Sequence, residues 1–356
     1  DLWVFDAANL GSALGGTPLR IVELFGDTPR ALAVSPDGSR VYAAIFHSGN
    51  RSTTINEGGV CDEFDPATAC NVNGTIVPGG VAGPAGNVGG EPAPEVGVIV
   101  QRNAAGDWLD DIGRDWSAAV RFDLPDEDVF EIDADTLAEV RTYPGVGTIL
   151  FNMAVNPANG KLYVSNLESR NLTRFEGPGI FGGSTVQGHL AEARIAILSP
   201  TEISSRHLNK HIDYGVLAGD PGFDPTARDH SLATPLEIAF SADGATVYVA
   251  AFGSDRIGVF PAAALEDDSF DPVALSSGYI AVPGGGPAGL VLDEPRARLY
   301  VATRFDNGVS VIDLATRNER QHHPLHNPEP AHVVAGRPFL YDARFSSANG
   351  EASCAS

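Results

Sequence analysis

The chain has 356 residues, of which 43% are hydrophobic, and it carries 46 Asp and Glu against 23 Lys and Arg, a formal net charge of −23. So acidic a surface repels phosphate backbones, which argues against nucleic acid as a partner. No apolar run reaches the roughly 18 residues that a membrane-spanning helix needs, whereas 40 Gly and 25 Pro are typical of a turn-rich β protein.

The N-terminal segment contains two apolar runs, over residues 2–6 and 19–25, that predict two strands. The sequence begins inside the first of these runs and has no initiator Met. We therefore expect it to be a processed or trimmed piece of a longer chain.

A repeated unit begins at residue 29 and occurs four times. Each copy contains an apolar run that alternates at period two, a tight turn, a second apolar run and, further on, a third. Alternation with β-branched and aromatic residues predicts strands. A glycine such as Gly244 allows the first turn, because glycine adopts positive φ at little cost. The second strand of each copy carries a tyrosine at the same place: Tyr42, Tyr163, Tyr248 and Tyr300.

This unit resembles the YVTN-type β-propeller repeat, named for the Tyr-Val that ends the second strand. The resemblance implies an all-β fold, a propeller of four-stranded antiparallel blades over residues 1–326. At least four blades are recognisable, five are expected in this chain, and up to seven if upstream blades are missing. Residues 2–25 then supply the third and fourth strands of a blade whose first two strands are C-terminal or precede Asp1. Insertions are expected over these ranges: 50–127, 167–192 and 216–233.

The largest insertion, residues 50–127, is rich in Gly, Pro and Asn in its first half. We expect an irregular loop as far as residue 95 and then a hairpin. Cys61 and Cys70 are predicted to form a disulfide, since a cross-link restrains a long loop that lacks a core; two free thiols are the alternative. A disulfide implies an oxidising compartment, so we expect a periplasmic, secreted or cell-surface protein. The two tryptophans of the insertion are expected to anchor it on the propeller, or else to form an interaction patch or an electron-hopping station.

Two pairs of side chains are candidate metal ligands. His207 and His211 are four residues apart, a spacing that on a helix would put both imidazoles on one face. Packed or hydrogen-bonded histidines in a strand or loop are the alternative. Asn152 and Glu237 begin equivalent strands of two blades and could together bind Ca²⁺ at the central channel. Spacing fixes no third ligand in either case.

The repeat stops at residue 327, and residues 327–356 have a different character. The run Gly336-Arg-x-x-Leu-Tyr-Asp-x-Arg-x-Ser, followed by Asn349-Gly-Glu-Ala-Ser-Cys-Ala-Ser, resembles the lead-in to the first haem site of bacterial di-haem cytochrome c peroxidases. The resemblance implies a c-type haem attached through Cys354 in the complete protein. The sequence stops before the second Cys and the axial His that such a site needs, so the chain as written is expected to bind no haem.

Three other side chains of this tail match the family pattern. The resemblance implies that Arg337, Tyr341 and Arg344 lie beside the haem and help to seat a propionate. As an alternative, residues 331–335 and 339–343 would be the first two strands of a closing blade.

These observations favour a non-catalytic propeller module of an exported haem-containing redox protein, related to cytochrome c or peroxidases. Its partner would be a haem domain or a redox partner protein, which it docks for electron transfer. One alternative is a binding or scaffold propeller at the cell surface or in the periplasm. Another is a metal-dependent propeller enzyme, lactonase-like or amine-dehydrogenase-like. A propeller fold does not decide among them, and the sequence leaves open whether this chain is an enzyme and what its oligomeric state is.

Overall fold

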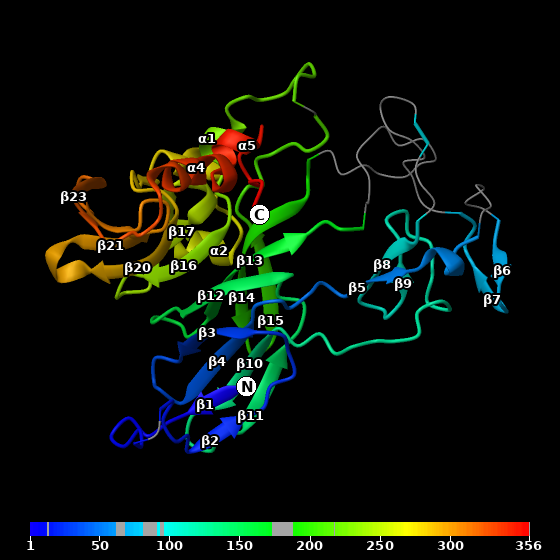
Figure 1. Cartoon of the computed structure of the whole chain (residues 1–356), viewed down its shortest axis with the longest axis horizontal. Coiled ribbons are helices and arrows are strands. Elements are labelled where there is room, and N and C mark those ends of the chain that lie inside the picture. The colour runs from blue at the N-terminus through cyan, green and yellow to red at the C-terminus, as the bar shows by residue number, and fades with distance from the viewer. Residues whose placement is uncertain are drawn as a thin grey trace.

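The computed structural model describes residues 1–12, 14–61, 68–80, 91–92, 96–172, 188–216 and 218–355. Four four-stranded antiparallel sheets follow one another along the chain, and each has its strands in sequence order (Figure 1). The all-β propeller with four-stranded blades is thereby confirmed. The first blade contains β3 (Pro29–Val34), β4 (Arg40–Ile45), β10 (Val129–Asp133) and β11 (Glu139–Tyr143), and the second contains β12 (Ile149–Val155), β13 (Leu162–Ser169), β14 (Ala191–Ser199) and β15 (Glu202–His207). The third blade contains β16 (Pro235–Phe240), β17 (Thr246–Ala251), β18 (Arg256–Pro261) and β19 (Ile280–Ala281). The fourth contains β20 (Pro287–Asp293), β21 (Arg298–Thr303), β22 (Gly308–Asp313) and β23 (Asn318–Pro324).

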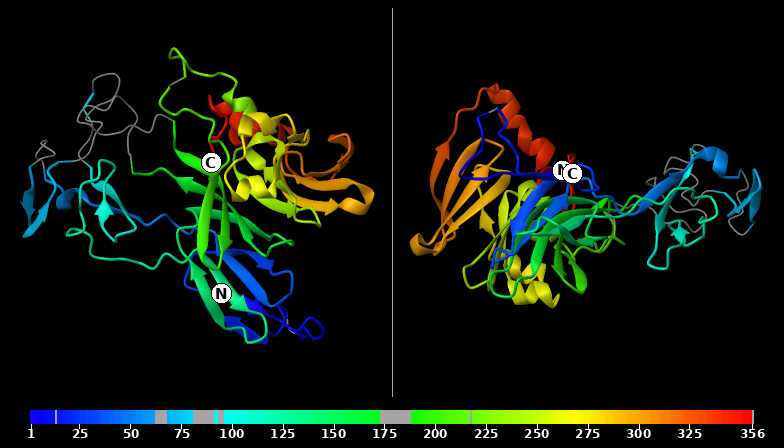
Figure 2. Two further views of the ribbon diagram at one scale, coloured as in Figure 1. Left: turned by 180° about the vertical axis from the view of Figure 1, so that it is seen from behind. Right: turned by 90° about the horizontal axis from the view of Figure 1, so that it is seen from below.

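The first strands of the blades lie next to one another in the order β3, β12, β16 and β20. The blades fan out from this inner row in an arc, from the first blade near the N-terminus to the last, which carries β23 (Figures 1 and 2). The inner ends of all four blades therefore border one common space.

Apolar side chains fill the spaces between adjacent blades. Successive residues of a strand point to opposite faces of its sheet. On β13, Leu162 and Val164 therefore pack in the core shared with the first blade, while Tyr163 packs in the core shared with the third. All three are at most 2% exposed. Burial on both faces explains why the second strand of the repeat is apolar at nearly every position.

The turn between the first two strands is fixed by a local hydrogen bond. In the first blade the hydroxyl of Ser35 donates to Asp37 Oδ1 at 2.6 Å, and Gly38 follows with φ of 74°. The fourth blade lacks this sequence and turns through the 3₁₀ helix η3 (Glu294–Arg296), after which Ala297 takes φ of 50°. Two different sequences thus make the same connection.

The N-terminal strands form a separate two-stranded sheet. β1 (Leu2–Val4) and β2 (Arg20–Val22) pair antiparallel, and Val22 packs in a core with Phe130 and Ile132 of the first blade. The described residues thus form four complete blades and two strands of another, whereas five blades were expected.

The C-terminal segment is helical, so the alternative of closing strands over residues 331–335 and 339–343 is wrong. The helix α4 (Ala331–Tyr341) starts after Pro330, and α5 (Ala343–Ser346) starts after Asp342, whose carboxylate accepts the Arg344 N–H at 2.9 Å. The reason lies in the pattern. These residues do not alternate at period two, and Pro330 and Asp342 are suited to helix starts.

The largest insertion forms a lobe with its own core. The expected hairpin after residue 95 is present as β8 (Val98–Arg102) and β9 (Trp108–Leu109), whereas the described residues before it contain three strands in place of a wholly irregular loop. The lobe projects from the propeller in Figure 1. Its two tryptophans pack inside it rather than on the propeller, and Trp116 Nε1 donates to Asp110 Oδ2 at 2.9 Å. The predicted disulfide joins Cys61 and Cys70 with an S–S length of 2.01 Å. The lobe also contains β5 (Ser52–Ile55), η1 (Glu57–Gly59), β6 (Cys70–Val72) and β7 (Thr75–Val77).

Short helices complete the chain: α1 (Ala227–His230), η2 (Phe252–Ser254), α2 (Ala262–Glu266) and α3 (Pro272–Ser276). Within the described ranges, no helix has the length and apolar character needed to cross a membrane.

Candidate functional site

A central cavity of about 910 Å³ opens where the first strands of the four blades begin. All four blades contribute to its wall, and so do the segment that leads into α4 and the helix itself. The lining includes Arg30, Phe151, Asn152, Leu236, Phe252, Ala288, Arg304, Phe305, Glu329, Arg337 and Tyr341.

A β-bulge at the start of each first strand shapes this wall. The pairing with the second strand shifts after the first residue of β3, β16 and β20 and after the second residue of β12, so each first strand carries one residue more than its partner at this point. Bulges redirect side chains and are frequent beside functional sites. The residues at these four bulges all line the cavity: Arg30, Phe151, Leu236 and Ala288.

The proposed Ca²⁺ ligands lie side by side, and of the two only Asn152 is in the lining of this cavity. Asn152 Nδ2 donates to Glu237 Oε2 at 2.5 Å, and burial raises the pKa of Glu237 above its ordinary value. The amide oxygen of Asn152 accepts the N–H of Met153 at 2.8 Å. Among the described residues no three His, Cys, Asp or Glu side chains are grouped closely enough to share a metal ion.

The two candidate histidine ligands do not share a helix. His207 ends β15 and His211 lies in the following turn, so the spacing of four has no helical meaning here. His211 Nε2 lies 3.0 Å from the carbonyl oxygen of Ala227. The ring of His207 lies parallel to that of His189, with centroids 6.4 Å apart, and burial lowers the pKa of His207 to about 4. Both imidazoles are half-buried; that of His207 packs parallel to another ring, and that of His211 lies within hydrogen-bond distance of a carbonyl oxygen.

Helix α4 is fixed at the mouth of the cavity by Arg337. Its guanidinium donates to the carbonyl oxygens of Arg304 and Phe305, at 3.1 and 2.9 Å, and pairs with Glu329. The ring of Tyr341 lies edge-on to that of Phe252, with centroids 5.7 Å apart.

Arg344 makes a second attachment, after the end of α4. It pairs with Asp255 of the propeller at 2.9 Å and with Asp342 at 2.6 Å. Arg337, Tyr341 and Arg344, picked out by the resemblance to peroxidases, thus all contact the propeller.

The tail beyond α5 lies against the propeller near α1. Ser231 Oγ donates to the carbonyl oxygen of Asn349 at 2.6 Å. Glu351 is buried, 3% exposed, and its Oε2 has no hydrogen-bond partner among the described residues. Burial raises the pKa of Glu351 to about 7. Cys354, three residues on, is exposed with a free thiol.

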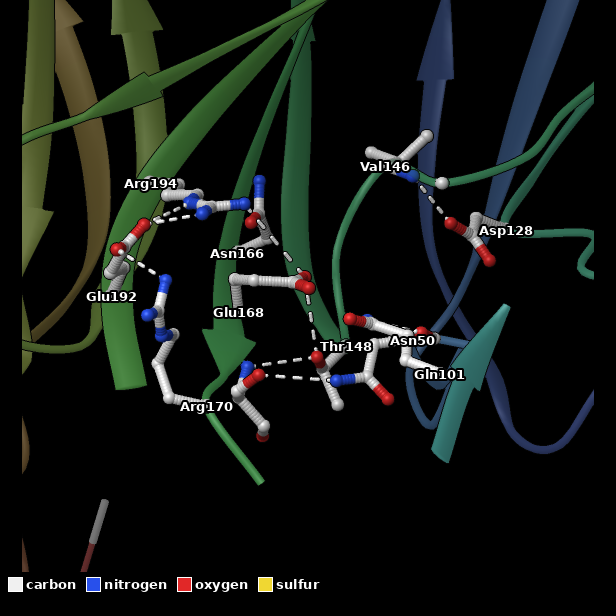
Figure 3. Close-up of polar contacts among 12 residues, drawn as sticks. Asn50, Gln101, Asp128, Val146, Thr148, Asn166, Glu168, Arg170, Glu192 and Arg194 are labelled. Atoms are coloured by element: carbon white, nitrogen blue, oxygen red, sulfur yellow. Dashed lines mark hydrogen bonds and ion pairs between the residues drawn. The ribbon is translucent and has the colours of Figure 1, made fainter. Parts of the chain in front are cut away.

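A second polar cluster joins the two longest insertions to the second blade (Figure 3). Glu192 lies between two guanidinium groups: Arg194 Nε donates to it at 2.7 Å, and Arg170 Nη1 forms an ion pair with it at 3.7 Å. Burial raises the pKa of Glu192, but hydrogen bonds from His189 and Arg194 outweigh this effect and lower it to about 2. Thr148 Oγ1 donates to Glu168 at 3.3 Å.

The same cluster reaches the neck of the inserted lobe, formed by the residues between β4 and β5 and those just before β10. Asn50 Nδ2 donates to the carbonyl oxygen of Ser169 at 3.1 Å, and Gln101 Nε2 donates to the carbonyl oxygen of Asn50 at 2.7 Å. Asp128, at the far end of the neck, is fully buried and accepts the N–H of Val146 at 2.6 Å. Desolvation, together with a nearby carboxylate, raises the pKa of Asp128. These bonds hold the lobe at a fixed place on the propeller edge.

Sequence reasoning missed the bulges and the cluster at the neck. The bulges have no local signal, because they are defined by pairing between strands. The neck cluster joins residues more than 100 positions apart, such as Asn50 and Ser169.

No family model matches the chain, and no curated protein is found as its relative. Solved structures that align with it include hydrazine synthase of Kuenenia stuttgartiensis, with 16% identity and a TM-score of 0.39 over 80% of this chain and 83% of that one. The periplasmic gluconolactonase of Pseudomonas aeruginosa gives 14% identity and a TM-score of 0.43 over 92% of this chain and 64% of that one. A dihydro-heme d1 dehydrogenase gives 13% identity and a TM-score of 0.32 over 85% of this chain and 59% of that one. The chain spans less than two thirds of the last two, and its fold assignment rests on its own sheets.

Proposed function

We propose that the propeller is a non-catalytic docking module of an exported redox protein, and that it positions a c-type haem domain of which α4 and α5 are the first helices. The observation that carries the proposal is the attachment of α4. Arg337 is bound to two propeller carbonyls and Tyr341 packs against Phe252. The segment that resembles a haem-domain lead-in is therefore held against a rigid body.

The position of Cys354 supports the same proposal. The tail is bonded to the propeller at Asn349, and the Cys354 thiol is exposed. Formation of a thioether to a haem vinyl group requires an accessible thiol. The disulfide between Cys61 and Cys70 supports export, since disulfides persist in oxidising compartments.

The direct test begins with the gene. The codons after Ser356 should encode Cys and His, which would complete the haem-attachment sequence. The extended chain, expressed in a periplasm that attaches c-type haem, should then carry covalent haem measurable as a pyridine haemochrome. Cys354→Ser in that chain should reduce covalent attachment, and the matched change Ser353→Ala should not. A stop codon directly after Ser356 would refute the proposal.

A cell-surface or periplasmic scaffold is the second candidate, and the inserted lobe favours it. The lobe has its own apolar core and stands away from the propeller (Figure 2). Insertions on a rigid framework are common binding sites. A scaffold should lose its partner in a pull-down when residues 50–126 are removed, whereas a haem-docking module should keep it.

A further inference from the structure

The central cavity is positively charged in an otherwise acidic protein. Its lining contains the guanidinium groups of Arg30, Arg304 and Arg337 against the single carboxylate of Glu329. The whole chain, by contrast, has two acidic side chains for every basic one. A concave site of one sign concentrates ligands of the opposite sign. An anion is therefore the natural occupant.

Two of these three guanidinium groups have no carboxylate partner. Arg337 pairs with Glu329, whereas Arg30 and Arg304 form no ion pair with any residue in the described part of the chain. Arg30 lies over the ring of Phe46 with its guanidinium carbon 4.7 Å from the ring centroid. Such stacking orients the planar group and leaves its N–H donors for a ligand.

The two free groups come from opposite ends of the arc. Arg30 belongs to the first blade and Arg304 follows β21 in the last blade. The lining also contains aromatic side chains, and the rings of Phe252 and Phe305 meet edge to face at 5.3 Å. At about 910 Å³ the space falls in the range of small-molecule sites, roughly 300–1,000 Å³.

We propose that this cavity binds an organic dianion, a molecule with an apolar body and a carboxylate near each end. Arg30 and Arg304 bind one carboxylate each, since a guanidinium matches the two oxygens of a carboxylate. The aromatic wall packs against the body. Both of these guanidinium groups belong to the blades, so the proposal can be tested without a haem domain.

The experiment is calorimetric titration of the whole chain with isophthalate, a rigid aromatic dicarboxylate. Saturable binding is expected with a Kd below about 1 mM, consistent with a ligand of this size. Arg30→Gln and Arg304→Gln should each weaken it about tenfold, the loss of one charge-assisted contact. Arg320→Gln, on the outer strand β23, is the matched control and should bind as the unaltered chain does. Circular dichroism checks that every variant is folded.

Two further probes separate the roles of the groups. Benzoate, with one carboxylate, should bind about tenfold more weakly, because one guanidinium is then left without an anion, and neutral benzamide should not bind. Absence of saturable binding up to about 10 mM isophthalate would overturn the proposal. So would unchanged affinity in both cavity variants, or equal affinity for benzoate.

Discussion

Replacing Glu351 with Gln should tighten the docking of the C-terminal tail at pH 8 and leave it unchanged at pH 4. Glu351 is 3% exposed, and its Oε2 meets no hydrogen-bond donor among the described residues. The Tyr214 hydroxyl, which is close enough to feel the charge of Glu351, is buried and also lacks a partner there. A carboxylate in such a place loses its hydration without gaining a counter-ion.

The magnitude follows from the pKa. Burial raises the pKa of Glu351 from 4.5 to about 7, and each pKa step of one corresponds to about 1.4 kcal/mol, so the shift amounts to about 3 kcal/mol. The docked tail binds the proton more tightly than the free tail does. Docking is therefore fully favoured below about pH 4.5 and loses up to about 3 kcal/mol as the pH rises through 7. Glutamine has nearly the same shape and no charge at any pH, so the variant should keep its docking free energy as the pH rises.

Hydrogen exchange is the suitable assay, because a terminal segment can detach without global unfolding. Backbone amides of residues 343–353 should exchange more slowly in Glu351→Gln than in the unaltered chain at pH 8, by up to about 100-fold for the full 3 kcal/mol, and equally at pH 4. Comparison at one pH cancels the intrinsic pH dependence of exchange. Glu23→Gln, at an exposed position, is the control. Equal exchange at pH 8, or faster exchange in the variant, would refute the reasoning.

Three other changes test the remaining contacts. Arg337→Ala removes the bonds that hold α4, so exchange in residues 331–341 should quicken by the equivalent of about 1–3 kcal/mol, while the β13 amides stay protected. Trp116→Ala should destabilise the inserted lobe by about 3–5 kcal/mol. Calorimetry should show that the unfolding transition of the propeller is unchanged. A lower unfolding temperature for both the lobe and the propeller would contradict a separate core. Reduction of the disulfide between Cys61 and Cys70 should lower the free energy of unfolding of the lobe by about 2–3 kcal/mol. The lobe should then unfold at a lower temperature with reductant than without it, and an unchanged temperature would mean that the disulfide does not stabilise the lobe.

The blades could be predicted because their signals are local. The turn at Gly38 is closed by hydrogen bonds to Asp37 from Ser35 and Ser39, each two residues away, and the strands on either side appear directly in the sequence as apolar runs. The tyrosine at Tyr163 marks a strand buried on both faces, a property that a single strand displays in its own composition. Four copies of such a pattern leave little freedom for another fold.

The tail and the lobe were harder to read, for different reasons. In α4 the sequence includes Gly336 and Pro338, both weak helix formers, and the helix is held by propeller carbonyls that no local pattern reveals. In the lobe the core is assembled from side chains as far apart as Ile55 and Trp116. Glycine between them favours an irregular loop in the sequence, whereas Gly74 and Gly106 lie in turns that connect paired short strands.

The central cavity shows where the repeats diverge and why this matters for function. The four copies share the features that make a blade, but at the bulge they carry different residues: Arg30, Phe151, Leu236 and Ala288. A bulged residue leaves the ladder, so its side chain is free of the packing that constrains its neighbours. Charge can therefore be placed on one side of the cavity and apolar surface on the others without disturbing any blade. Substitution at the bulges should accordingly alter what the cavity binds while leaving the propeller folded.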